Sequence, residues 1–284
     1  GRGCWRPRWP DPVATTPAAA YYRHPHVRTR LREACGVAAG SDAGDSAVFV
    51  AGLGPCTEAL PDWEHVRATL PADLDKLCEA GCDIARSLWD RRRLIFLFEI
   101  DYLNVDRPGE AFLRPAEVFF KLEPVFAATR RGLRELAIGA DAVVTGRGYH
   151  FSGGIPLDDP LVDRLARLTA GVPAWHRGLP RRVPAGLAAS MNPRHARAAE
   201  GLGRLIEYLA HLVLRNVSSR SSIPVVFNGT VVGSGVVGRE CASLDFSHVG
   251  DPLDVRHFRV AFSTYQWHRL RPDIFGPQAS TSVA

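Results

Sequence analysis

The sequence contains almost no lysine, one methionine and no long hydrophobic run. Lys76 and Lys121 are the only lysines among 35 basic residues, so arginine carries the formal net charge of +5. A GC-rich coding bias explains this imbalance first, and phosphate binding by the guanidinium groups needs support from elsewhere in the sequence. The longest apolar runs, such as residues 94–98, are far shorter than the roughly 20 residues of a membrane span. We therefore expect no contact with a membrane.

The six cysteines are too few and too widely spaced for a disulfide-rich framework. Cys78 and Cys82 lie four residues apart on a predicted helix and would supply only two of the four ligands that structural zinc requires. We therefore predict no zinc and expect reduced thiols instead of a disulfide framework. The remaining cysteines are scattered, at Cys4, Cys35, Cys56 and Cys241.

The chain has 284 residues, 46% of them apolar, which is enough for a hydrophobic core in one large domain or two modest ones. Residues 1–25 contain no segment like a signal peptide, so we expect a cytoplasmic protein. Since the first residue is Gly1 and the only methionine is Met191, we expect a fragment or a trimmed start. We predict an irregular segment over residues 1–30 and a single catalytic domain over residues 31–284.

The predicted elements alternate at first and end in consecutive strands. This order indicates an α+β fold with a mixed or antiparallel sheet, and not a strictly alternating parallel sheet. Residues 171–194 are rich in proline, glycine and arginine and predict a loop. Helices are expected at residues 62–70, 72–90, 115–136, 159–170 and 195–215, and strands at 47–53, 94–101, 141–145, 148–152, 222–229, 239–246 and 255–262.

Two predicted strands carry acidic residues at their ends. Glu99 and Asp101 are two residues apart, so their carboxylates lie on one face of the strand and Phe98 and Ile100 on the other. Asp245 likewise shares a face with Ser243 and Cys241. A divalent cation would relieve the repulsion between neighbouring carboxylates, and Mg²⁺ or Mn²⁺ prefers such oxygen ligands. Plain solvated strand ends explain these acids equally well.

A glycine-rich turn lies between the two acidic strands, in the sequence TGRGYHF over residues 145–151. Glycine lets backbone amides approach a ligand closely, and Thr145 and Arg147 add groups suited to phosphate. His150 follows at the start of a strand, where a structural histidine is the commoner case. A second glycine pattern, GSGVVG over residues 233–238, precedes a strand and not a helix, so we interpret it as a hairpin turn and not as a dinucleotide site.

The acidic pair Glu99-x-Asp101, then Gly148-x-His150, then Leu244-Asp245 resemble, in this order, the three motifs of the archaeo-eukaryotic primase superfamily. Each motif is short, so the resemblance rests on their order, spacing and strand context over residues 94–267. It implies an RRM-like sheet with flanking helices. It also implies template-directed nucleotidyl transfer, as primer synthesis or extension, on single-stranded DNA.

The resemblance further implies that Glu99, Asp101 and Asp245 are catalytic and hold two Mg²⁺ or Mn²⁺ ions. The implied partners are nucleoside triphosphates, a single-stranded DNA template, and a helicase, large primase subunit or repair factor. Surface charge is the alternative explanation for the arginines near the end of the chain. The implied nucleotide-binding residues are Thr145, Arg147, Gly148, His150, Arg256, Arg259, Ser263 and His268.

The sequence departs from the family pattern at two points. Glu99 stands where aspartate is commoner, and no cysteine lies between His150 and Cys241, so we predict that the family's zinc module is absent. Two other classes of function stay open: a metal-dependent phosphodiesterase or nuclease, and a non-catalytic nucleic-acid-binding module of degenerate primase fold. The glycine-rich turn favours a triphosphate ligand over hydrolysis, and the three acids with His150 argue against a degenerate module.

Overall fold

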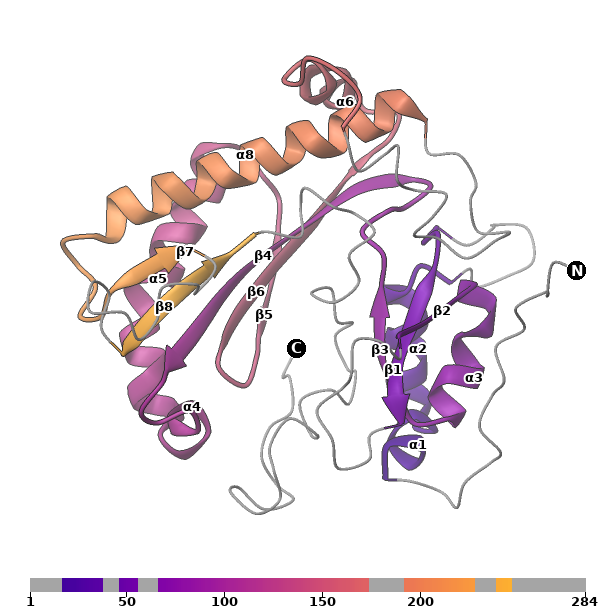
Figure 1. Cartoon of the computed structure of the whole chain (residues 1–284), viewed down its shortest axis with the longest axis horizontal. Coiled ribbons are helices and arrows are strands. Elements are labelled where there is room, and N and C mark those ends of the chain that lie inside the picture. The colour runs from indigo at the N-terminus through magenta and orange to yellow at the C-terminus, as the bar shows by residue number, and fades with distance from the viewer. Residues whose placement is uncertain (1–16, 38–45, 56–65, 174–191, 228–238, 247–284) are drawn as a thin grey trace, which may run out of the picture.

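The described part of the chain forms an α+β structure with two β-sheets (Figure 1). The larger sheet has five strands and the smaller one three, so the α+β class with a mixed sheet is confirmed. The computed structural model describes residues 17–37, 46–55, 66–173, 192–227 and 239–246.

The five-stranded sheet has the order β5-β6-β4-β8-β7. Its central strand pairs antiparallel with both neighbours, the β5–β6 pair is antiparallel, and only β7 runs parallel to β8. Along the chain, a strand, a long helix, a hairpin, a second long helix and two further strands follow one another. The strands are β4 (Arg93–Asn104), β5 (Asp141–Val144), β6 (Gly148–Pro156), β7 (Val225–Phe227) and β8 (Glu240–Asp245).

Helices cover one face of this sheet (Figure 1). The two long ones are α5 (Pro115–Glu135) and α8 (Pro193–Val217), and each begins with proline at a position where its missing N–H costs nothing. Asn192 caps α8 by accepting a hydrogen bond from the Arg194 N–H. The shorter α4 (Glu110–Leu113) precedes α5, and α6 (Pro160–Ala166) packs on α8.

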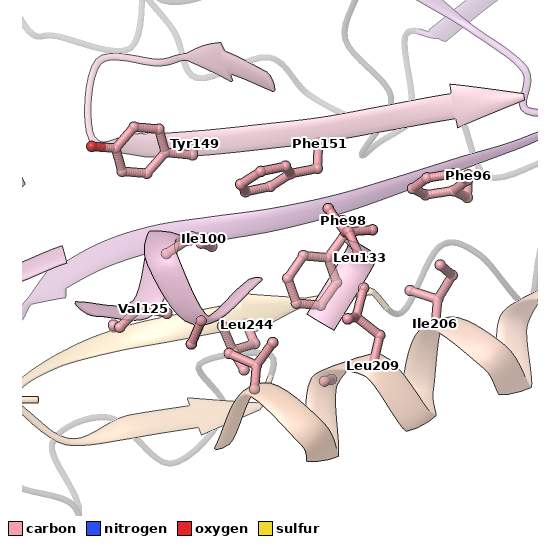
Figure 2. Close-up of a cluster of buried hydrophobic side chains, with 14 of the residues drawn as sticks. Phe96, Phe98, Ile100, Val125, Leu133, Tyr149, Phe151, Ile206, Leu209 and Leu244 are labelled. Atoms are coloured by element: carbon pink, nitrogen blue, oxygen red, sulfur yellow. The ribbon is translucent and has the colours of Figure 1, made fainter. Parts of the chain in front are cut away.

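The main core lies between the sheet and these helices. Every second residue of β4 is directed to it, including Phe96, Phe98 and Ile100, and the helices contribute stripes that include Val125 and Leu209 (Figure 2). All five side chains are at most 1% exposed. The residues between them on β4, Glu99 and Asp101 included, therefore belong to the opposite face of the sheet, as the sequence predicted.

A second, smaller core lies on the antiparallel sheet β2-β1-β3. Tyr22, Leu31, Leu77 and Ile84 are among its fully buried side chains. Its elements are α1 (Pro17–Tyr22), α2 (Pro25–Ala34), β1 (Val50–Pro55), β2 (Val66–Thr69), the 3₁₀ turn η2 (Pro71–Asp73), α3 (Leu74–Glu79) and β3 (Cys82–Arg86).

Several predictions for the first 90 residues were wrong, whereas the strand expected at 47–53 overlaps β1. The irregular segment expected over 1–30 is helical from Pro17 onward, because Pro17 and Pro25 start helices and the helices pack their apolar residues on the small sheet. The helix expected at 62–70 contains strand β2 where the structure describes it. The helix expected at 72–90 ends at Glu79, since Gly81 adopts a positive φ of 68° and strand β3 follows. Cys78 and Cys82 therefore do not share a helix face.

Later predictions agree with the structure. Strand 94–101, helix 115–136 and helix 195–215 correspond closely to β4, α5 and α8. Residues 141–145 and 148–152 form a hairpin, and residues 222–229 and 239–246 contain β7 and β8. The strand expected at 255–262, the hairpin turn at 233–238 and most of the loop at 171–194 lie outside the described residues.

Candidate functional site

The strand register brings the acidic residues and the histidine of the three motifs side by side. On the central strand, Glu99 lies directly opposite His150 of β6 and directly opposite Asp245 of β8. Directly opposite residues on antiparallel strands have Cβ atoms about 5 Å apart. Two strands that are well separated in the sequence thus place a carboxylate and an imidazole on either side of Glu99.

A second row of residues crosses the sheet beside the first. Asp101 is opposite Gly148 of β6 and Ser243 of β8, and Thr145 donates its backbone N–H to the Gly148 carbonyl at 2.9 Å. Because side chains alternate along a strand, residues two apart share a face, so both rows belong to the face opposite the helices. Thr145, Asp101 and Ser243 therefore form a row next to His150, Glu99 and Asp245.

The β5–β6 turn is tied to the central strand by both backbone and side chain. The Arg147 carbonyl accepts a hydrogen bond from the Tyr102 N–H at 2.8 Å. The Arg147 guanidinium donates from Nη2 to Asp101 Oδ2 at 2.6 Å, which makes an ion pair. This turn thus brings a positive charge directly onto one of the three acidic residues.

Glycine at position 148 is required by packing against the backbone. A Cβ atom there would lie 1.8 Å from the Ile100 carbonyl oxygen and 3.2 Å from Asp101 Cα. No side chain fits at that distance, so strand β6 approaches β4 this closely only with glycine. The sequence predicted that Gly148 lets backbone amides approach a ligand. The structure gives the residue a structural reason, and its predicted nucleotide contact stays a prediction.

The hydroxyl of Thr145 is buried without a hydrogen-bond partner. Thr145 is 5% exposed, and its Oγ1 is one of two buried side-chain atoms without a hydrogen-bond partner in the described part of the chain. Leaving a buried hydroxyl unsatisfied costs about 1–3 kcal/mol. A ligand with a free oxygen at this turn would recover that cost.

Four charged or titratable side chains of the site differ in exposure, and the guanidinium-bearing Arg147 is the most exposed of them. The side chains of Glu99 and Asp101 are 8% and 13% exposed, those of His150 and Arg147 23% and 34%. Burying several carboxylates close together is unfavourable unless positive charge or hydrogen bonds compensate. The nearby positive charge of Arg147 supplies part of this compensation for Asp101.

His150 contributes little positive charge to this site at neutral pH. Its Nε2 lies 3.3 Å from Glu99 Oε1. Burial lowers the pKa of His150 to about 4, and Arg147 acts in the same direction, while Asp101 and Asp245 oppose the shift only in part. The imidazole is therefore neutral at pH 7, and its contact with Glu99 is not an ion pair at that pH.

A polar network next to the site holds the end of the central strand. The Tyr102 hydroxyl lies 2.5 Å from an oxygen of Glu110 and 2.5 Å from an oxygen of Glu240. Asn104 donates to Glu110 at 2.7 Å, and Lys121 pairs with Glu240. These contacts connect β4 to α4, α5 and β8. The sequence contained no signal for this network, because Glu110 and Glu240 are 130 residues apart.

The site differs from the predicted set in two respects. Ser243 lies opposite Asp101, and the alternation that links it to Asp245 was the signal that could have included it. The residues expected from the last part of the chain cannot be placed, since they lie outside the described residues: Arg256, Arg259, Ser263 and His268.

The donor set suits a hard divalent cation, because three carboxylates from two neighbouring strands supply the oxygen ligands that Mg²⁺ and Mn²⁺ prefer. Within the described ranges, no group of three or more His, Cys, Asp or Glu residues is positioned to hold a metal ion in the present side-chain conformations. Asp101 instead binds Arg147. A metal at these carboxylates would thus require side-chain movement.

The helices of the described region include none that is both long and apolar enough to cross a membrane.

Comparison with known proteins identifies no relative. No family model, no curated protein and no solved structure matches this chain.

Proposed function

We propose that this chain is a template-directed nucleotidyltransferase of the primase-polymerase type, acting on single-stranded DNA. The observation that carries the proposal is the register that places Asp245 and His150 on either side of Glu99, with Asp101 in the adjacent row. These are the residues of the three motifs by which the sequence resembles the archaeo-eukaryotic primase superfamily.

The connectivity of the larger sheet supports the same proposal. Apart from β7, its strands and long helices follow the order strand–helix–hairpin–helix–strand with the antiparallel arrangement β5-β6-β4-β8, which resembles the split β-α-β arrangement expected of an RRM-like core. The acids lie on the sheet face that the helices leave uncovered. Primase-polymerases are expected to use this face for catalysis.

In this proposal, Glu99, Asp101 and Asp245 hold two Mg²⁺ or Mn²⁺ ions. When bound, such ions neutralise charge on the triphosphate and activate the attacking hydroxyl. Arg147 and Thr145 bind phosphate oxygens through a guanidinium and a hydroxyl. His150, neutral at pH 7, contacts the nucleotide without adding charge, and the Tyr102 network keeps the end of β4 in place.

The test is template-directed synthesis with Asp101→Asn. The purified chain is given single-stranded DNA, ribo- and deoxyribonucleoside triphosphates, and Mg²⁺ or Mn²⁺, with and without a primer. We expect synthesis by the unchanged chain and a loss of at least about 100-fold in the variant, the scale lost with one electrostatic catalytic group. The exposed Asp158, replaced by asparagine, serves as the control and keeps full activity.

The products discriminate between the possible functions. New strands without a primer indicate a primase, and extension that needs a primer indicates a polymerase. Metal-dependent degradation of the template without synthesis would favour a nuclease. Binding of single-stranded DNA with neither reaction would favour a non-catalytic module. Equal synthesis rates for Asp101→Asn and the unchanged chain would show that the metal assignment is wrong.

A further inference from the structure

The contact between Arg147 and Asp101 has a consequence for the order in which ligands bind. We propose that Arg147 is an exchangeable counter-ion, which occupies Asp101 in the free chain and moves to the nucleotide's phosphates when a divalent cation takes its place. Metal binding and nucleotide binding are thereby coupled. This inference rests on the proposed function, because it takes the metal and the triphosphate as the ligands of the site.

The first step is the strength of the contact in the free chain. Nη2 of Arg147 lies 2.6 Å from Asp101 Oδ2, and the Asp101 side chain is only 13% exposed. A charge-assisted hydrogen bond at this distance in a partly buried environment is stronger than a surface ion pair. A divalent cation that binds Asp101 alone must therefore displace this guanidinium or sit beside it, and both are unfavourable.

The second step is that the arginine can leave without unfolding the turn. Its backbone is fixed, because its carbonyl accepts the Tyr102 N–H and the turn closes through Thr145 and Gly148. The long side chain of Arg147 is 34% exposed. Movement of the guanidinium requires changes in side-chain torsions, which are fast in exposed residues.

The third step is the destination of the arginine. A guanidinium binds phosphate through two parallel hydrogen bonds. Contacts between Arg147 and a triphosphate therefore replace the ion pair that Arg147 gives up when it leaves Asp101. The unsatisfied Thr145 hydroxyl lies two residues away in the same turn and gains a partner from the same phosphates. Arg147 thus lowers the affinity for a cation that binds alone, because the two compete for Asp101. It raises the affinity for a cation that binds together with a nucleotide, because the guanidinium then contacts the phosphates. Such reciprocal coupling typically amounts to 5- to about 150-fold in affinity.

The experiment measures Mn²⁺ affinity by titration with electron paramagnetic resonance, with and without a non-hydrolysable nucleoside triphosphate. For the unchanged chain we expect weak binding of Mn²⁺ alone and binding at least about 5-fold tighter with the nucleotide. In Arg147→Gln, Mn²⁺ alone should bind at least about 5-fold more tightly, and the increase in affinity caused by the nucleotide should be at least about 5-fold smaller than in the unchanged chain.

Two further variants serve as controls. Arg147→Lys keeps a positive charge at the turn and should retain weak binding of Mn²⁺ alone, which separates the effect of charge from that of a damaged turn. Arg164→Gln, at an exposed position of α6, should behave as the unchanged chain. Circular dichroism of each variant checks that the fold is kept.

The outcomes separate this inference from the proposed function. Unchanged or weaker binding of free Mn²⁺ in Arg147→Gln overturns the exchange, even if the chain synthesises DNA. Mn²⁺ binding that is insensitive to Asp101→Asn overturns both the inference and the metal site. Coupled binding that depends on Arg147, in a chain that synthesises nothing, supports the inference and contradicts only the polymerase activity.

Discussion

His150 illustrates how the environment of one residue determines its chemistry. A histidine near pH 7 can carry either charge state, and the sequence alone could not distinguish them. In the structure, His150 is on a central part of the sheet, opposite a buried glutamate. Burial lowers the pKa to about 4, so the protein keeps the imidazole neutral throughout the physiological range.

This shift makes stability depend on pH in a defined direction. The pKa of His150 is lower in the folded chain than the usual 6.5, so between pH 6.5 and 4 the unfolded state binds more protons. Stability is therefore fully present above pH 6.5 and is lost as the pH falls toward 4. Between pH 7 and 4.5, we expect the free energy of unfolding of His150→Gln to fall by about 1–2 kcal/mol less than that of the unchanged chain.

The measurement is urea denaturation at several pH values from 7 to 4.5, in buffer that contains a chelator. Burial also lowers the pKa of His195, but that residue is present in both proteins and its contribution cancels in the comparison. Parallel pH profiles for the unchanged chain and His150→Gln would show that His150 titrates normally.

Among the site residues, the acids were the most predictable and the turn was the least. Alternation along a strand placed Glu99 and Asp101 on one face, and no other information was needed. That Asp245 and His150 lie on either side of Glu99 depends on strand pairing over as many as 146 residues, which only the resemblance to a family indicated. The ion pair between Arg147 and Asp101 depends on the geometry of the turn, which residue types alone do not determine.

At the scale of helices and strands, the pairing of β6 with β4 positions the site. The two strands pair from Arg93 opposite Pro156 to Asp101 opposite Gly148. At Gly148 a side chain would collide with the backbone of Ile100. The close approach at this end brings the turn with Arg147 within reach of Asp101.

Gly148→Ala should therefore separate the two strands at the site. We expect it to destabilise the chain by about 1–3 kcal/mol, as overpacking does, and to lower Mn²⁺ affinity because Asp101 moves. Gly139→Ala is the matched control, since a Cβ atom at that position would meet nothing within 4 Å. Its free energy of unfolding should stay within about 0.5 kcal/mol of the original. Equal stability of the two variants in urea denaturation would contradict the proposed close approach.

Elements with a strong amphipathic pattern were predicted well, and short elements were not. Both α5 and α8 bury a regular stripe of apolar residues over more than 20 residues, so periodicity sufficed. Strand β2 has four residues and strand β3 five, and each exists because it pairs with β1. Residues 72–90 were expected to continue as a helix because the break at Gly81 depends on a positive φ that the pattern did not reveal.

At the scale of the whole molecule, the described residues form two cores, and the segment between β3 and β4 connects them. A buried ion pair organises this segment. Arg86 Nη2 donates to Asp90 Oδ2 at 2.6 Å, and Arg86 also donates to the carbonyl of Ala34, at the end of α2 beside the smaller core. The other Asp90 oxygen accepts from the backbone N–H groups of Arg92 and Arg93, where the central strand begins. The Asp90 carboxylate thus links the elements around the smaller core to β4, the strand that carries Glu99 and Asp101.

Replacing Asp90 by alanine should accordingly destabilise far more than loss of a surface ion pair. The Arg86 and Asp90 side chains are 6% and 2% exposed, so the variant leaves a buried guanidinium without its carboxylate, at a cost of about 3–5 kcal/mol. Glu33→Ala removes an exposed ion pair with Arg30 and should cost less than about 1 kcal/mol.

Urea denaturation measures the free energy of unfolding of both variants. Hydrogen exchange tests whether Asp90 holds the segment between β3 and β4. In Asp90→Ala the amides of Arg92 and Arg93 lose their acceptor and should exchange faster than in the unchanged chain, whereas in Glu33→Ala they should not change. A local loss of protection at these two amides with unchanged exchange in α8 would mean that this segment opens while the main core stays folded. Unchanged protection at both amides would mean that Asp90 does not hold the start of β4, and that the position of Glu99 and Asp101 depends on strand pairing alone.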